Sequence, residues 1–377
     1  MTNYEIEMEL DKASKALSKE TQSVNLSYWN SGSEYKAKLK DILKYESGQD
    51  IFDYQYYLPE SIKKNIANKL GFSSEDFYES QGFAFSQSTH SIVTIAVFLS
   101  QRNLKTGIIA PAYFTAQTCL DDLKVAYHVF NEFIPDFNQN FDINSLINSD
   151  CEAFWFTSPI NSTSVYFNQN VINGIQELLD AGKWVILDEA LCVNGKELSR
   201  TLGIPEKLIY IYSPHKALGI QGIKFSVIVT HKKYSDEIDR LKDCYGGSLN
   251  YLSEMGASHF ISQNYDECLR FYNQFWSDNY KRVHQILANY HFAHVSPDIS
   301  GHYAMIFLDG CIGTENFIFA IKKLIKEKGY LIFPGVMHGF DISKQFCFRI
   351  NLLLNKTDLE KGLISVLDYM GKFIENA

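Results

Sequence analysis

The middle of the chain alternates short apolar runs with segments of helical periodicity. Each run is rich in β-branched and aromatic residues and is bounded by turn or polar residues, which is typical of buried strands. These runs are Gly107–Pro111, Glu152–Thr157, Trp184–Leu187, Leu208–Tyr212 and Phe225–Val229. Between the second and third runs, apolar residues recur at helical spacing, at Val171, Ile172, Ile175, Leu178 and Leu179. The alternation predicts βαβ units, and hence an α/β fold with a mostly parallel sheet flanked by helices.

The pattern changes from about Asn264. An aromatic-rich helical segment extends to about Tyr290, and strands are expected at Tyr303–Leu308 and Phe346–Leu354. A last helix begins with capping-box spacing at Thr357–Glu360. Its apolar face comprises Leu359, Leu363, Val366 and Met370. We therefore expect a large domain over residues 46–263 and a smaller α+β domain built from both termini, residues 1–45 and 264–377.

The composition argues against several classes of function. The 377 residues are 46% hydrophobic and 21% charged, which is typical of a globular protein with two domains. A net charge of -9 argues against binding to nucleic acid, which needs a basic face. No run approaches the roughly 18 apolar residues of a membrane span, and the N-terminal segment lacks the apolar core of a signal peptide. The seven cysteines are scattered without a C-x-x-C pair, which argues against a disulfide framework or a zinc site. We expect a cytoplasmic protein without a bound metal.

Two residues follow neighbouring predicted strands, where ligands bind in parallel sheets. Asp188 follows the strand that ends at Leu187, and Lys216 lies in a Ser- and Gly-containing turn after the strand that ends at Tyr212. Taken alone, Asp188 is as compatible with a helix cap as with a ligand contact, and an isolated lysine is most often solvated. Their shared position after buried strands favours a role in binding.

Together these segments resemble the fold-type I enzymes that use pyridoxal 5′-phosphate (PLP), the aspartate aminotransferase superfamily. Its signature is an aspartate after one strand, then Ser-x-x-Lys after the next, in a turn of the form Lys-x-x-Gly-x-x-Gly-x-Arg. Here Ser213 and Lys216 match, Gly219 and Gly222 are in place, and Lys224 stands where the family usually has arginine. The resemblance implies that Lys216 forms a Schiff base with PLP.

Further motifs match the family in the same order along the chain. Ser86, Gln87, Ser88 and Thr89 occupy the position of the turn that holds the phosphate, together with Ser213 and Lys224. Pro111-Ala-Tyr113 is similar to the segment whose aromatic ring stacks on the pyridine. Thr157-Ser-Pro159-Ile-Asn161 resembles Pro-x-Asn-Pro-Thr-Gly, whose asparagine contacts the phenolic oxygen of PLP and lies at the substrate site.

The C-terminal segment completes the resemblance. Phe333-Pro-Gly335 followed by Phe348-Arg349 is similar to the family pattern whose arginine binds the substrate α-carboxylate. Strand alternation places Arg349 on the face opposite Phe348 and Ile350, which fits a ligand cleft and solvent equally well. The resemblance also implies a homodimer in which a partner residue reaches the phosphate. The tyrosines of the Tyr54–Tyr57 run are the candidates for that residue, and packing inside the chain is an equally good interpretation of them.

The physical chemistry agrees with these roles. PLP acts as an electron sink only while its ring nitrogen is protonated, and a buried carboxylate such as Asp188 stabilises that cation. The lysine must be a free amine to form an imine, so burial and nearby cations that lower its pKa assist the reaction. A phosphate is favoured by hydroxyl groups and by the N–H groups of a helix N-terminus. The planar fork of Arg349 matches a carboxylate.

Three departures from the family pattern leave the reaction open. Leu191 stands where transaminases usually have a tyrosine that also contacts the phenolic oxygen. Ser162 and Ser164 replace the proline and glycine after Asn161, and Lys224 replaces arginine. The leading hypothesis is an aminotransferase that acts on an amino acid and a 2-oxo acid. The alternative is a PLP-dependent lyase, cyclase or oxidase on the same fold. A ligand-sensing regulator is disfavoured, because the chain lacks the length and the basic charge of an added DNA-binding domain.

The sequence leaves the substrate side chain undetermined. Tyr28, Trp29, Phe83 and Phe85 are candidates for an aromatic pocket. Because aromatic residues form 14% of the chain, these four are at least as compatible with the hydrophobic core.

Overall fold

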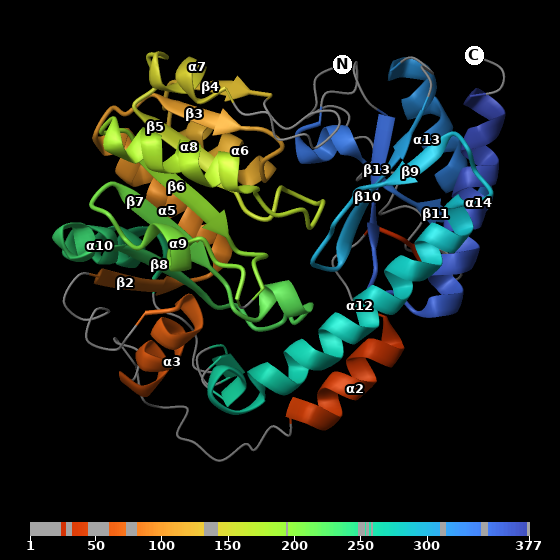
Figure 1. Cartoon of the computed structure of the whole chain (residues 1–377), viewed down its shortest axis with the longest axis horizontal. Coiled ribbons are helices and arrows are strands. Elements are labelled where there is room, and N and C mark those ends of the chain that lie inside the picture. The colour runs from red at the N-terminus through yellow and green to blue at the C-terminus, as the bar shows by residue number, and fades with distance from the viewer. Residues whose placement is uncertain are drawn as a thin grey trace. The chain divides into compact units, whose positions relative to one another are not determined.

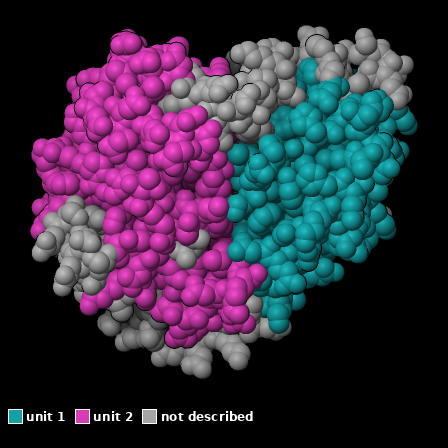
Figure 2. Space-filling model, in the orientation of Figure 1, with its two compact units in different colours: residues 1–39, 162–165, 271–377 teal, residues 40–161, 166–270 magenta. Residues whose placement is uncertain are grey.

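The structure is a computed structural model of the whole chain (Figure 1). It describes residues 24–27, 32–43, 60–72, 81–131, 142–193, 195–247, 253, 256–257, 259–309, 314–340 and 346–374. The Cα positions group into two compact units, which Figure 2 distinguishes by colour. Unit 1 comprises residues 1–39, 162–165 and 271–377, and unit 2 comprises residues 40–161 and 166–270. The domain limits expected from the sequence, 46–263 against 1–45 with 264–377, stay a prediction.

A seven-stranded sheet forms the centre of unit 2. Its strand order is β2-β8-β7-β6-β5-β3-β4, and only the pairs that involve β8 are antiparallel. The strands are β2 (Gln81–Ser86), β3 (Thr106–Ile109), β4 (Tyr127–Phe130), β5 (Ala153–Thr157), β6 (Trp184–Glu189), β7 (Leu208–Tyr212) and β8 (Ser226–His231). The predicted α/β class with a mostly parallel sheet is confirmed.

The helices of unit 2 follow the strands in the βαβ manner (Figure 1). They are α3 (Glu60–Leu70), α5 (Ser88–Gln101), α6 (Phe114–Asp122), α7 (Ile143–Ile147), α8 (Gln169–Asp180), α9 (Ser199–Leu202), α10 (Ser235–Gly246) and the short helices η1 (Lys216–Leu218), η2 (Lys232–Tyr234) and η3 (Phe260–Asn264). The amphipathic segment of the sequence analysis is α8, which buries Val171, Ile175 and Leu178. Its N-cap residue Asn168 accepts a hydrogen bond from the backbone N–H of Val171 at 3.1 Å.

Alternation along β6 sends neighbouring side chains to opposite faces of the sheet. Trp184 and Ile186 belong to a buried apolar cluster with residues of α5, α6 and α10. Asp188 continues this series, so its side chain leaves β6 on the same face, while Glu189 leaves on the other. The two acidic residues at the end of β6 therefore occupy different environments.

Unit 1 is a smaller α+β unit. Its antiparallel sheet has the order β12-β13-β10-β9, and a parallel pair joins β1 to β11. The strands are β1 (Val24–Asn25), β9 (Ala293–Val295), β10 (Tyr303–Leu308), β11 (Tyr330–Leu331), β12 (Phe333–Pro334) and β13 (Phe346–Asn351). The helices are α13 (Thr314–Lys328), α14 (Lys356–Ile374), η4 (Gly335–His338) and most of α2 (Ser33–Leu43) and α12 (Tyr265–Leu287). Because β1 pairs with β11, the N-terminal segment is part of the same unit as the C-terminal one, as expected.

Among the described helices, none is long and apolar enough to cross a membrane.

Candidate active site

Asp188 lies at the carboxyl end of the parallel sheet. Its register neighbours are Thr157 on β5 and Ile211 on β7. The side chain is 4% exposed, and its Oδ1 accepts a hydrogen bond from the backbone N–H of Ala190 at 3.1 Å. Burial raises the pKa of this carboxyl, and the charge of Lys216 opposes the shift. The structure thus places a buried carboxyl group next to a lysine.

Lys216 begins η1, in the turn that follows β7. The side chain retains partial exposure, yet enough protein surrounds it that burial lowers its pKa, with Asp188 opposing and Lys224 adding to this shift. Gly219 ends the turn with φ +74°, in the left-handed region that glycine adopts without strain, and its N–H donates to the Lys216 carbonyl at 3.1 Å. The net fall in pKa favours the free amine that imine formation requires.

Tyr113 lies near Lys216, and Asn161 contacts the residue that precedes Tyr113. The Nζ of Lys216 is 5.4 Å from the centre of the Tyr113 ring. Asn161 donates from Nδ2 to the backbone carbonyl of Ala112, the neighbour of Tyr113, at 2.9 Å. The structure therefore brings together three residues that the sequence predicted from three separate motifs.

The N-terminus of α5 forms the candidate phosphate end. Ser88 is the first residue of α5, and its Oγ is 2.9 Å from the Oγ of Ser213. The helical hydrogen bonds begin with the N–H of Ser91 donating to Gln87, so the N–H groups of the preceding turn point out of the helix end. Thr89 belongs to that turn and is exposed. Hydroxyl groups and helical N–H groups in one place suit a phosphate.

The other predicted phosphate residues are less well defined. Lys224 is exposed, and its charge influences Lys216 and His215. Ser86 ends β2 opposite Ser226, and only its backbone is described. The structure assigns neither of them a contact with Ser88 or Ser213.

Three buried polar atoms near this turn have no hydrogen-bond partner among the described residues. They are Thr157 Oγ1, Ser158 Oγ and His215 Nδ1. Ser158 is next to Asp188 in space, since its N–H donates to the Asp188 carbonyl at 3.0 Å. Buried polar atoms without hydrogen-bond partners are rare in folded proteins, and a polar cofactor bound here would supply such partners. Together with the Asp188–Lys216 pair, these residues fit PLP.

His215 is a residue that the sequence analysis missed. It is 3% exposed, and burial lowers its pKa to about 3, with further lowering by Lys216 and Lys224. It is therefore neutral around pH 7. Its position directly before Lys216 was the available signal.

Arg349 occupies a separate cluster within unit 1. It is 2% exposed, so the interpretation as a solvated surface residue is wrong. Its Nη1 donates to Ser162 Oγ at 3.2 Å, and its Nη2 donates to the Ser27 carbonyl at 2.6 Å. The guanidinium carbon lies 4.3 Å from the centre of the Tyr303 ring and 5.6 Å from that of Phe333. Aromatic faces of this kind stabilise a buried guanidinium.

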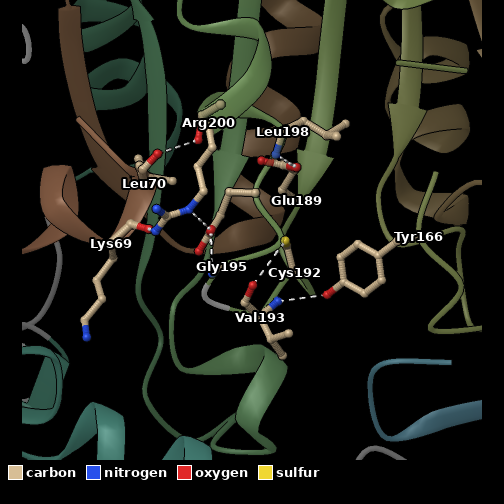
Figure 3. Close-up of polar contacts among 11 residues, drawn as sticks. Lys69, Leu70, Tyr166, Glu189, Cys192, Val193, Gly195, Leu198 and Arg200 are labelled. Carbon is tan, nitrogen blue, oxygen red and sulfur yellow. Dashed lines mark hydrogen bonds and ion pairs between the residues drawn. The ribbon is translucent and has the colours of Figure 1, made fainter. Parts of the chain in front are cut away.

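Glu189 belongs to a second buried polar cluster on the other face of β6 (Figure 3). Its Oε1 accepts from the N–H of Leu198 at 2.8 Å. In the same loop, Glu197 Oε2 accepts from the N–H of Gly195 at 2.7 Å and from Arg200 Nε at 2.9 Å. Burial raises the pKa of Glu189 well above its ordinary value. This cluster shapes the loop after Asp188, and the sequence analysis did not identify it.

Leu191 is half-buried in that loop and offers no hydroxyl group. Tyr166 accepts a hydrogen bond from the N–H of Val193 at 3.0 Å, which fixes the loop two residues further on (Figure 3). Tyr28, Trp29 and the Tyr54–Tyr57 run lie outside the described residues, and of Phe83 and Phe85 only the backbone in β2 is described.

A mostly parallel seven-stranded sheet with a smaller unit built from both termini is the fold of the PLP-dependent aminotransferases of fold-type I. Solved structures of such enzymes match this chain over nearly its whole length. The chain has the fold of this class, which confirms the fold that the sequence motifs predict.

Particular relatives can be named. A kynurenine aminotransferase from Pyrococcus horikoshii matches with a TM-score of 0.77 at 14% identity and covers 97% of this chain and 94% of its own. A PLP-dependent aminotransferase from Streptococcus suis gives a TM-score of 0.74 at 15% identity, covering 98% and 97%. In sequence, the histidinol-phosphate aminotransferase of Pyrococcus furiosus is 30% identical over 115 residues.

The sequence match is partial. It spans 30% of this chain and 32% of the histidinol-phosphate aminotransferase, and no protein-family model matches the chain. Structural similarity at these identities establishes the fold, so the activity has to follow from the chemistry of the site.

Proposed function

We propose that the protein is a PLP-dependent aminotransferase that moves an amino group between an amino acid and a 2-oxo acid, with the cofactor attached to Lys216. The observation that supports this most strongly is the pair at the ends of β6 and β7. There a buried Asp188 lies next to a lysine whose pKa is lowered by burial. A carboxyl group suits a cationic ring nitrogen, and a free amine suits an aldehyde. Binding of a group that carries both explains why Asp188 and Lys216 lie at one edge of the sheet.

Each residue of the site has a defined role in this proposal. PLP supplies an electron sink that stabilises negative charge at the substrate α-carbon. With PLP bound, Asp188 would hold the proton on the ring nitrogen, and Tyr113 would lie against the ring. Asn161 would donate to the phenolic oxygen and contact the substrate. Lys216 Nζ, as a free amine, accepts and returns the α-proton.

The phosphate and the substrate carboxylate each need cationic or N–H donors. For the phosphate we assign the turn of Ser86, Gln87, Ser88 and Thr89, with Ser213 and Lys224. The hydrogen bond between Ser88 and Ser213 and their place at the α5 N-terminus support this assignment. For the α-carboxylate we assign Arg349, whose burial between aromatic rings supports a role beyond solubility.

We further infer a homodimer in the cytoplasm, with amino and oxo acids as its small-molecule partners. The homodimer follows from the resemblance to fold-type I enzymes, and the scattered cysteines support a reducing compartment.

A lyase is the alternative that a specific observation favours. Leu191 cannot supply the hydroxyl group that contacts the phenolic oxygen of PLP in transaminases. Its absence can change the balance between amino transfer and elimination. Elimination would release ammonia from an amino acid without any 2-oxo acid acceptor.

The two reactions differ in their products. The PLP-loaded protein is incubated with a panel of amino acids, with and without pyruvate or 2-oxoglutarate. Aminotransfer predicts that a new amino acid forms from the acceptor in equal amount to the 2-oxo acid formed from the donor. Ammonia release in the absence of acceptor would establish the lyase instead, and no product from any amino acid would contradict both. A Lys216→Ala variant serves as the matched control and should form no product.

A further inference from the structure

We propose that Ser162 and His338 are positioning residues that fix the guanidinium of Arg349 for the α-carboxylate of the substrate. This inference rests on the proposed function, because it takes Arg349 as the carboxylate-binding residue. All the contacts that support it lie within unit 1.

The three side chains form one hydrogen-bonded chain. Arg349 Nη1 donates to Ser162 Oγ at 3.2 Å, and the same Oγ is 2.9 Å from His338 Nδ1. All three residues are buried, with exposures of 2% for Arg349, 3% for Ser162 and 7% for His338. Hydrogen bonds to a charged group are stronger when water is excluded, so this chain holds one end of the fork firmly.

The donors that each group offers bear on which atom donates in each of these two hydrogen bonds. Burial and the neighbouring Arg349 charge lower the pKa of His338 well below its ordinary value, so the imidazole is neutral. A neutral imidazole with its proton on Nε2 accepts at Nδ1. The guanidinium has only donors, so Ser162 accepts from Arg349, and in this tautomer, which we assign as part of the proposal, Ser162 donates its own proton to His338. Removal of the imidazole would leave the Ser162 hydroxyl free to turn away from the guanidinium.

The backbone at Ser162 and Ser164 is left-handed. Ser162 has φ +64° and Ser164 has φ +56°, both in the left-handed region that non-glycine residues seldom adopt. Proline, which the related motif has at this position, is restricted to φ of about -65° and cannot take this conformation. A proline at position 162 would therefore not fit this turn, and the strained turn presents the Ser162 hydroxyl group to Arg349.

The other side of the guanidinium is held independently. Nη2 donates to the Ser27 carbonyl at 2.6 Å, and the Tyr303 ring lies 4.3 Å from the guanidinium carbon. Each terminal nitrogen of arginine carries two N–H groups, so these two hydrogen bonds use one on each nitrogen. Ser27 and Ser162 therefore hold the two terminal nitrogens of the fork and fix its plane.

The first test compares two serines of the same turn. Ser162→Ala removes the hydroxyl that touches Arg349. Ser164→Ala removes a hydroxyl that accepts from the Tyr303 N–H at 3.2 Å and is not in the chain to Arg349. Both keep a left-handed non-glycine residue, so the backbone strain is matched. The probe is whichever of pyruvate, 2-oxoglutarate and phenylpyruvate binds the PLP-loaded protein most tightly. None of the three has an amino group that could react with PLP, and the Kd is measured by calorimetry.

We expect Ser162→Ala to raise this Kd about tenfold, the effect of losing one hydrogen bond to a charged group. The KM for the amino acid should rise by a similar factor while kcat changes by less than about twofold. Ser164→Ala should leave the Kd within about twofold of the parent value. Equal Kd values for the two variants would overturn the inference.

The second test uses amides that mimic one nitrogen of histidine. His338→Asn places an amide near the position of Nδ1, and His338→Gln places it near Nε2. We expect His338→Asn to keep the parent Kd within about threefold and His338→Gln to raise it about as much as Ser162→Ala, because only asparagine reaches Ser162. The reverse order, or no difference, would exclude the Nδ1 contact as the reason for the effect.

Failure of the proposed function gives a different result. A parent protein that binds one of the three 2-oxo acids but transfers no amino group would overturn the aminotransferase while leaving the Ser162 comparison in force. A parent protein that binds none of them would contradict both proposals.

Discussion

Asp188 and Lys216 influence each other's proton affinity at the end of the parallel sheet. A carboxylate at the pyridine nitrogen would stabilise the electron sink, so its loss should affect turnover more than cofactor binding. We predict that Asp188→Ala lowers kcat by about two orders of magnitude or more, as for other preorganised electrostatic groups. PLP should still be retained through Lys216 and the phosphate, which absorbance after gel filtration would show. Unchanged turnover in a PLP-loaded variant would rule out the role.

His215 makes stability depend on pH. Its pKa falls from 6.5 to about 3 on folding, so between these values the unfolded chain binds more protons than the folded protein. The contribution of neutral His215 is complete above about pH 6.5 and is lost as the pH falls toward 3, by about 1.4 kcal/mol per pH unit.

A substitution isolates this effect. The unfolding free energy of His215→Gln, measured by denaturant titration of the PLP-free protein, should fall less steeply than that of the parent between pH 6.5 and 4. The exposed His291 gives the matched control, since His291→Gln should parallel the parent. Parallel curves for all three proteins would show that the pKa of His215 does not change on folding.

At the scale of single elements, β6 holds two carboxyl groups on opposite faces. Burial raises the folded pKa of Glu189, and Glu197 and Asp188 add to this against the Leu198 N–H. Because the folded pKa exceeds the unfolded one, the contribution of protonated Glu189 is complete below about pH 4.5 and is lost as the pH rises. Glutamine does not titrate, and its carbonyl can still accept from Leu198.

Glu189→Gln should therefore gain stability relative to the parent as the pH rises above about 4.5. The gain should be about 1.4 kcal/mol per pH unit until the folded pKa is reached. Glu177→Gln, on the exposed face of α8, is the control and should follow the parent. The measurement is unfolding by denaturant from pH 4.5 to 8. A constant difference between Glu189→Gln and the parent would mean that Glu189 does not change its protonation on folding.

The hydrophobic pattern of the sequence identified the strands of the large sheet that are buried. It missed strands whose place in the sheet depends on pairing with another strand. The runs at β3, β5, β6, β7 and β8 are apolar enough to be identified without the structure. The edge strand β4 is half-buried and β2 joins the sheet only through β8, so neither stands out in the sequence.

The same distinction applies to the site. Asp188, Lys216 and Ser213 follow predicted strands, so topology alone brings them to one edge. Ser27 and Arg349 are 322 residues apart, and no local pattern links them. His338 was missed for the same reason, because only the folded unit brings it to Ser162.

For the whole molecule, the proposal requires two chains. We predict a particle of twice the 43.2 kDa chain mass by light scattering at assay concentration. If a tyrosine of the Tyr54–Tyr57 run reaches the phosphate of the partner, one of the single variants Tyr54→Phe, Tyr56→Phe and Tyr57→Phe should weaken PLP binding by about tenfold. A fully active monomer would contradict the shared site.

The central claim is that Lys216 carries the cofactor. Reduction of the PLP-loaded protein with borohydride makes the attachment permanent, and peptide mapping then locates the pyridoxyl group. The account predicts one label, on Lys216, and loss of that label in Lys216→Ala. A label on Lys224 or on any other lysine of the parent protein, or no label at all, would contradict it.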